Sequence, residues 1–183
     1  PPLMPTRARE LARLIPNDAD AYRLGLKAIA EGRSDEARNL LAGVMRDDTA
    51  NATQAELALG DAQAYAGLFA DAAKTFEHAA RRRPERPMLL VQAAVAWLHV
   101  GQDEKAEPLI AEATKLCEKT PGQLDRELAF CLHVEAVLRL MQGRQFAEAR
   151  ECCLRARTLL EKAGEKGSTI MAACLNNEAV LYL

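Results

Sequence analysis

The chain has 183 residues, of which 49% are hydrophobic and only 4% aromatic, so its core must be filled mainly by Ala, Leu and Val. The charged residues, 27% of the total, nearly balance to a net charge of −2, which excludes a global field that would recruit nucleic acid or an anionic membrane. No apolar run is long enough to insert into a bilayer. We therefore predict closely packed helices that choose their partner through a local surface.

Four segments in succession are each marked by a glycine, at Gly32, Gly67, Gly101 and Gly143, with intervals of 35, 34 and 42 residues. An alanine follows each glycine after five or six residues. Seven positions before each glycine lies another small residue: Gly25, Gly60, Ala94 or Ala136. Apolar residues three and four apart on both sides predict a pair of helices with the glycine at the turn. Small residues are required where two helices cross closely.

In chain order, the pattern predicts an N-terminal helix at 6–16, helix pairs at about 18–51, 53–86, 87–120 and 124–164, and a single first helix at 168–183. The decapeptide CLHVEAVLRL at 131–140 returns as CLNNEAVLYL at 174–183, so the later repeats are longer than the earlier ones. A recurring supersecondary element of this length predicts one all-α array that covers residues 1–183.

These markers resemble the tetratricopeptide repeat (TPR) family along almost the whole chain. The repeat at 53–86 carries the family's pattern most completely, with Leu59, Gly60, Gly67, Ala72, Phe76, Ala79 and Pro84. The later repeats resemble the longer, forty-two-residue variety of kinesin light chains, and LNNEAVLYL is similar to the first helix of that variety. The resemblance implies a right-handed α-α superhelix whose first helices line a concave groove that holds peptides.

Groove-facing positions carried over from the family are mostly apolar, which favours an adaptable apolar binding surface. They are Tyr22, Leu26, Leu57, Asp61, Tyr65, Met88, Val91, Val95, His99, Phe130, His133, Val137, Met141, Asn176 and Asn177. Some of these residues can equally belong to the helix-packing core, because an apolar helical stripe often is core. Asn176 and Asn177 resemble groove asparagines that hold a bound peptide backbone, and as ordinary solvent-facing residues they would have no such role.

Other residues that could carry chemistry have simpler structural interpretations. The basic run Arg81, Arg82, Arg83 and Arg86 lies where cations stabilise a helix C-terminus, although it could also contact phosphate or an acidic peptide. Cys152 and Cys153 are expected to be buried, inert thiols. Neither the cysteines nor the three histidines show metal-binding spacing, and the chain has no catalytic or nucleotide-binding motif. We predict neither catalysis, nor a metal, nor any other cofactor.

Two functions are compatible with this pattern. The first is a non-catalytic protein–protein interaction scaffold that binds a peptide or amphipathic segment of a partner protein in its groove. The second is a regulatory TPR region of a larger signalling enzyme or transcription regulator. The odd number of cysteines without a disulfide framework favours a cytoplasmic location. Because the last repeat stops within its first helix, we expect either a longer native solenoid or a homodimer that covers this open end.

Overall fold

The computed structural model describes residues 13–44, 50–143, 145–165 and 167–181. In these ranges every regular element is an α-helix and no β-strand occurs, which confirms the predicted all-α fold class. The nine helices of the described ranges are α2 (Ala21–Ala30), α3 (Ser34–Val44), α4 (Ala50–Tyr65), α5 (Phe69–Arg82), α6 (Pro87–His99), α7 (Asp103–Glu118), α8 (Asp125–Met141), α9 (Phe146–Lys162) and α10 (Thr169–Val180). Most of the helix predicted at 6–16 lies outside the described residues.

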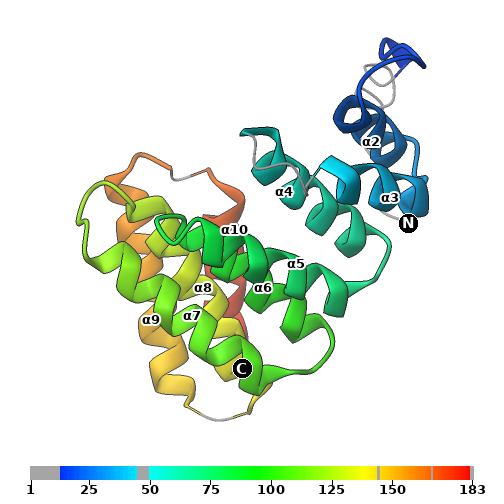
Figure 1. Cartoon of the computed structure of the whole chain (residues 1–183). Coiled ribbons are helices and arrows are strands. Elements are labelled where there is room, and N and C mark those ends of the chain that lie inside the picture. The colour runs from blue at the N-terminus through cyan, green and yellow to red at the C-terminus, as the bar shows by residue number, and fades with distance from the viewer. Residues whose placement is uncertain (1–12, 45–49, 144, 166, 182–183) are drawn as a thin grey trace. The chain divides into compact units, whose positions relative to one another are not determined.

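The chain divides into two compact units, an N-terminal unit (residues 1–82) and a C-terminal unit (residues 83–183). The N-terminal unit contains the helix pairs α2–α3 and α4–α5, and the C-terminal unit contains α6–α7, α8–α9 and the single helix α10 (Figure 1). The prediction of one continuous array over residues 1–183 therefore stays a prediction. Across the described residues, none of the helices combines the length and the apolar character that crossing a membrane requires.

Short polar signals set the starts of several helices. The Asp20 carboxylate accepts a hydrogen bond from the Arg23 backbone N–H at 2.9 Å and so caps α2, and the Ser168 hydroxyl caps α10 through the Met171 N–H at 3.2 Å. Pro87 begins α6, where its missing N–H has no helical partner in any case. One α4 boundary differs from the prediction, because this helix begins at Ala50 and not at residue 53.

The turn inside each helix pair is made by the glycine that marks the repeat. These four glycines have φ between 63° and 78°, in the left-handed region that other L-residues rarely adopt. The left-handed turn ends the first helix and lets the second return against it, as in the contacts of α4 with α5 and of α8 with α9. The recurring glycine is thus the residue that creates each helix pair.

Small residues bring the two helices of a pair together in the N-terminal unit. A Cβ atom on Gly25 would lie 2.6 Å from Leu41 Cδ2, and one on Gly60 would lie 2.5 Å from Phe76 Cε1. Leu41 and Phe76 are both buried, and Leu41 forms a core cluster together with Ala55 and Leu59. The predicted crossing points of small and large residues are therefore present in both pairs.

A buried carboxylate links α4 to α5. The Glu56 side chain is fully buried, and its Oε1 atom lies 2.8 Å from His78 Nδ1 and 3.1 Å from Arg82 Nη1. Glu56 Oε2 is also buried and has no hydrogen-bond partner among the described residues. Arg82 of the basic run is thus part of an internal ion pair. Its neighbour Arg83 forms a surface pair, with its Nη1 atom 3.8 Å from Oε1 of the exposed Glu85.

The C-terminal unit has two layers. The first helices α6, α8 and α10 form one layer, in which α8 contacts both of its neighbours. The second helices α7 and α9 form the other layer; α7 packs against α6 and α8, and α9 packs against α8 and α10. The core between the layers is built mainly from alanine, leucine and cysteine, and includes Ala94, Ala113, Cys131 and Cys153. This packing leaves the outer face of α6, α8 and α10 available for a binding surface.

Candidate groove of the C-terminal unit

A pocket of about 430 Å³ opens between α6 and α8 on the outer face of the first-helix layer. Its described lining residues are Val95, Leu98, His99, Phe130, His133, Val134, Val137 and Met141. Six of these, all except Leu98 and Val134, are among the predicted groove residues. None of the described lining residues is Asp, Glu, Lys or Arg, so the pocket is apolar apart from two imidazole rings. We call it the histidine pocket.

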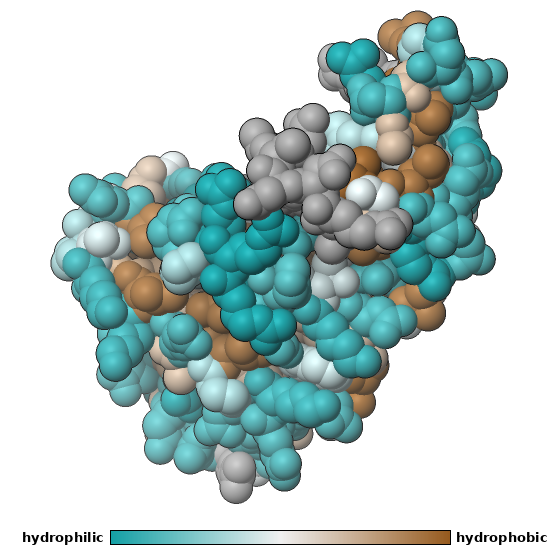
Figure 2. Space-filling view, viewed as in Figure 1, coloured by the Kyte–Doolittle hydropathy of each residue, from teal (hydrophilic) through white to brown (hydrophobic). Residues whose placement is uncertain are grey.

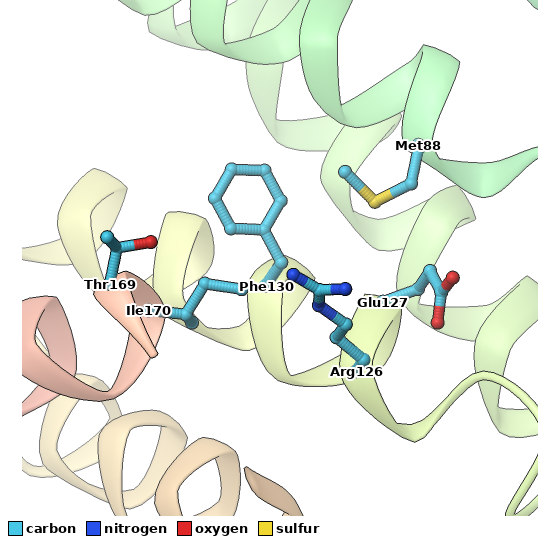
Figure 3. A pocket seen from close by; sticks show the side chains of 6 residues that line it. All are labelled: Met88, Arg126, Glu127, Phe130, Thr169 and Ile170. Carbon is cyan, nitrogen blue, oxygen red and sulfur yellow. The ribbon is translucent and has the colours of Figure 1, made fainter. Parts of the chain in front are cut away.

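A second pocket of about 420 Å³ lies further along the same layer, toward the start of α8. It is lined by Met88 of α6, by Arg126, Glu127 and Phe130 of α8, and by Thr169 and Ile170 of α10. Figure 3 shows the Phe130 ring between Met88 on one side and Thr169 on the other. We call this the charged pocket, because Arg126 and Glu127 contribute ionised groups to it. Phe130 is a wall of both pockets.

His133 lies at the centre of the site. Its ring is stacked on that of Phe130, with centroids 6.2 Å apart and an angle of 28° between the planes. The Asn177 Nδ2 atom of α10 lies 3.3 Å from His133 Nδ1. Burial lowers the pKa of His133 below its ordinary value, because a charged imidazolium loses water contacts there. This environment favours the neutral form of the ring.

Two of the predicted groove residues in the C-terminal unit behave differently from the rest. Val91 is completely buried and belongs to the helix-packing core, because its position on α6 faces inward. This corrects its assignment to the groove surface. Asn176 is exposed, and only its neighbour Asn177 contacts a side chain of the histidine pocket.

The remaining predicted groove residues lie in the N-terminal unit. Tyr22 is partly buried against the Leu41 core cluster, and its hydroxyl lies 3.5 Å from Gln54 Oε1. Leu26 and Leu57 are half-buried, whereas Tyr65 is 54% exposed. Asp61 lies at the surface, yet desolvation by neighbouring atoms raises the pKa of its carboxyl. The structure gathers none of these five residues into the two pockets described above, and their place in a groove stays a prediction.

Sequence reasoning did not assign Arg126, Glu127, Val134, Thr169 or Ile170 to the site. The sequence did contain evidence for four of them. The similarity of α8 to α10 at an interval of 43 residues places Arg126 and Glu127 at positions equivalent to Thr169 and Ile170. These residues lie one helical turn before the position of Phe130, where their side chains reach the same face. The position of Val134 in the helical pattern is also that of a core residue, so the sequence alone could not assign it to the pocket.

The surface of the C-terminal unit is mostly hydrophilic, and hydrophobic side chains reach it in small groups (Figure 2). Two such residues lie on α10, where Leu175 and Val180 are 48% and 53% exposed. Ala179 is exposed as well, whereas Tyr182 lies outside the described residues. These residues give α10 an uncovered apolar surface in the described part of the chain.

All five cysteines are buried thiols in the C-terminal unit, which confirms the expected burial of Cys152 and Cys153. Burial raises the pKa of each thiol, to about 11 for Cys152, Cys153 and Cys174. A thiolate, the reactive species, is thus scarce at neutral pH.

We expect the folded protein to resist alkylation by iodoacetamide at pH 8, since its thiols are both inaccessible and protonated. All five cysteines should react once guanidinium has unfolded the chain, as counted by intact mass. Rapid native labelling of any one cysteine would contradict this burial.

Raised thiol pKa values also predict the effect of alkaline pH on stability. The folded state keeps protons that the unfolded state releases, so the stabilisation is complete below the unfolded value near 9 and is lost as pH rises toward 11. The free energy of unfolding, measured by urea titration, should therefore fall between pH 9 and pH 11 and should fall less after substitution of Cys174 by alanine.

Several solved structures share this architecture. No family model matches the chain, and no curated protein matches it in sequence. Among solved structures, BtubC (BKLC) from P. vanneervenii aligns with a TM-score of 0.71 at 18% identity, over 97% of this chain and 80% of its own. PcrH from Pseudomonas aeruginosa aligns with a TM-score of 0.52 at 20% identity, over 73% of this chain and 92% of its own. MamA from MSR-1 aligns with a TM-score of 0.50 at 19% identity, over 86% of this chain and 95% of its own.

All three of these structures are of the TPR type, and BtubC belongs to the kinesin-light-chain-like variety that the later repeats resemble. Identities this low establish the fold and not the activity. The match to BtubC extends over nearly the whole chain, so it includes the helix pairs of both units. The chain therefore has the TPR-type fold, an all-α solenoid of paired helices.

Proposed function

We propose that the protein is a non-catalytic interaction scaffold, and that the face of α6, α8 and α10 binds an apolar or amphipathic segment of a partner protein. The observation that carries this proposal is the histidine pocket, an open apolar cavity on the layer of first helices. An open pocket of about 430 Å³ falls within the size range of ligand sites. Four of its six predicted residues are at equivalent repeat positions, since Val95 and His99 on α6 correspond to Val137 and Met141 on α8. The TPR-type fold supports protein partners, and a location in the cytoplasm is part of the same proposal.

Displayed peptide libraries provide a probe while the natural partner is unidentified. Peptides selected on the full chain should bind the wild-type protein, as measured by fluorescence anisotropy. Met141→Glu should lower their affinity about tenfold or more, which corresponds to about 1.4 kcal/mol of binding free energy. Met141 lines the histidine pocket and is 56% exposed, so this charge reaches a bound apolar segment without disturbing the fold. Binding should persist at high salt, because apolar contact is not screened.

The matched control is Leu154→Glu, which adds the same charge to an exposed leucine of α9 in the other layer. This variant should bind the selected peptides as wild type does. Equal losses in both variants, or binding that disappears at high salt, would contradict a site in the histidine pocket.

A further inference from the structure

The contact between Asn177 and His133 determines what the histidine pocket offers to a ligand. An amide nitrogen can only donate, so Asn177 Nδ2 at 3.3 Å makes His133 Nδ1 the acceptor. A neutral imidazole carries one proton, and with Nδ1 as acceptor that proton lies on Nε2. Asn177 belongs to α10 and His133 to α8, so the packing of these two helices brings the amide to the ring.

The surroundings of the ring keep it uncharged. Phe130 is stacked on one side of it, and the described residues that share the pocket contribute no carboxylate to stabilise a positive charge. Desolvation by burial lowers the pKa of His133 as well. The polar group of the ring that remains for a ligand is one neutral N–H donor beside an apolar cavity.

We propose that Asn177 is a positioning residue that holds His133 as the Nε2–H tautomer, and that the pocket thereby selects a peptide residue with an uncharged apolar side chain whose backbone carbonyl accepts from Nε2–H. This inference rests on the proposed function and specifies its ligand. A peptide residue supplies both features at once, because its side chain and its carbonyl group leave the same Cα atom.

Complementarity of charge decides against other occupants. A lysine or arginine side chain would lose water in a cavity whose described lining contains no carboxylate, at a considerable cost in free energy. A hydrocarbon without an acceptor would fill the cavity but leave the His133 donor unpaired. The contact with His133 uses one N–H of the Asn177 amide and leaves its second N–H and its Oδ1 atom for other partners.

The tautomer can be measured directly on the full chain. Imidazole ¹⁵N chemical shifts at pH 8 should show His133 protonated at Nε2 in the wild-type protein. Asn177→Leu removes the donor and should give a mixture of the two tautomers. The matched control is Asn176→Leu, which changes the neighbouring exposed asparagine and should leave the His133 shifts as they are. A wild-type ring protonated at Nδ1 would overturn the proposal.

Binding is then tested with three small probes in NMR titrations of the same samples. N-acetyl-L-phenylalanine methylamide should perturb His133 and Phe130, and Asn177→Leu should weaken it several-fold while Asn176→Leu does not. Propylbenzene lacks the acceptor, and its affinity should be unchanged by Asn177→Leu. N-acetyl-L-lysine methylamide should perturb neither ring. Absence of binding by the phenylalanine probe, equal binding by the lysine probe, or an unchanged phenylalanine affinity in Asn177→Leu would each overturn the proposal.

These outcomes separate this inference from the proposed function. If Met141→Glu abolishes binding of displayed peptides while Asn177→Leu leaves it unchanged, the groove binds peptides and the role of Asn177 is wrong. If Met141→Glu has no effect on displayed peptides but the phenylalanine probe depends on Asn177, the pocket takes small molecules and the scaffold function is wrong.

Discussion

Replacing Gly60 by leucine is expected to destabilise the N-terminal unit by about 1–3 kcal/mol. Even a Cβ atom at this position would lie 2.5–2.9 Å from three atoms of the Phe76 ring, which is itself buried between α4 and α5. The side chain must therefore push the two helices apart or expel the ring. Thermal unfolding followed by far-UV circular dichroism should show a melting temperature lower by about 2–4 °C for each kcal/mol lost.

Gly43→Ala is the matched control for this experiment. Gly43 is also a helical glycine of the N-terminal unit, but apart from its own helix no described part of the chain lies within 4 Å of the Cβ position, so alanine should stabilise the helix by up to about 1 kcal/mol. The double variant Gly60→Leu with Phe76→Ala should recover part of the loss, because the small side chain leaves room. An unchanged melting temperature in Gly60→Leu would show that the helices do not cross at this residue.

Replacing Arg82 by methionine should destabilise the protein by about 3 kcal/mol, because it leaves a fully buried carboxylate with too few partners. Arg82 Nη1 is one of two donors to Glu56 Oε1, and the other, His78, is half-exposed. Glu56 Oε2 already has no hydrogen-bond partner in the described part of the chain. Urea titration measures the change in the free energy of unfolding.

Two comparisons show whether the buried charge causes the loss. Lys74→Met removes a surface cation on the same helix, 3.9 Å from the exposed Asp71, and should change stability by less than about 1 kcal/mol. The double variant Glu56→Met with Arg82→Met should lose less than Arg82→Met alone, since an apolar pair leaves no charge without a partner. A double variant less stable than the single one would contradict this account.

The sequence predicted the helix pairs because their determinants are local. A turn glycine, a small residue seven positions earlier and a large residue nine positions later lie within one repeat, so Gly60, Gly67 and Phe76 could be read together. The same register also predicted most of the histidine pocket, since equivalent positions on α6 and α8 face the same side. Val91 was assigned to the groove because its position on α6 is equivalent to that of His133 on α8, 42 residues later, yet Val91 is completely buried.

Contacts between individual side chains far apart in the sequence could not be predicted in this way. The basic run ending α5 suggested a helix cap or an anionic ligand, whereas Arg82 reaches Glu56 on α4, a partner 26 residues away. The role of Asn177 likewise depends on His133, 44 residues earlier. Repeat spacing places such residues on the same face, but the choice of partner depends on side-chain geometry. The division into two compact units had no marker in the repeat pattern either.

Phe130 lines both pockets of the C-terminal unit. We therefore expect that a ligand which turns this ring in one pocket changes the shape of the other. A ligand that favours one ring orientation changes the free energy of binding at the neighbouring pocket, and linkage requires the effect to be equal in both directions. If one bound segment placed a side chain in each pocket, the binding free energy of the two side chains together would differ from the sum of their separate contributions.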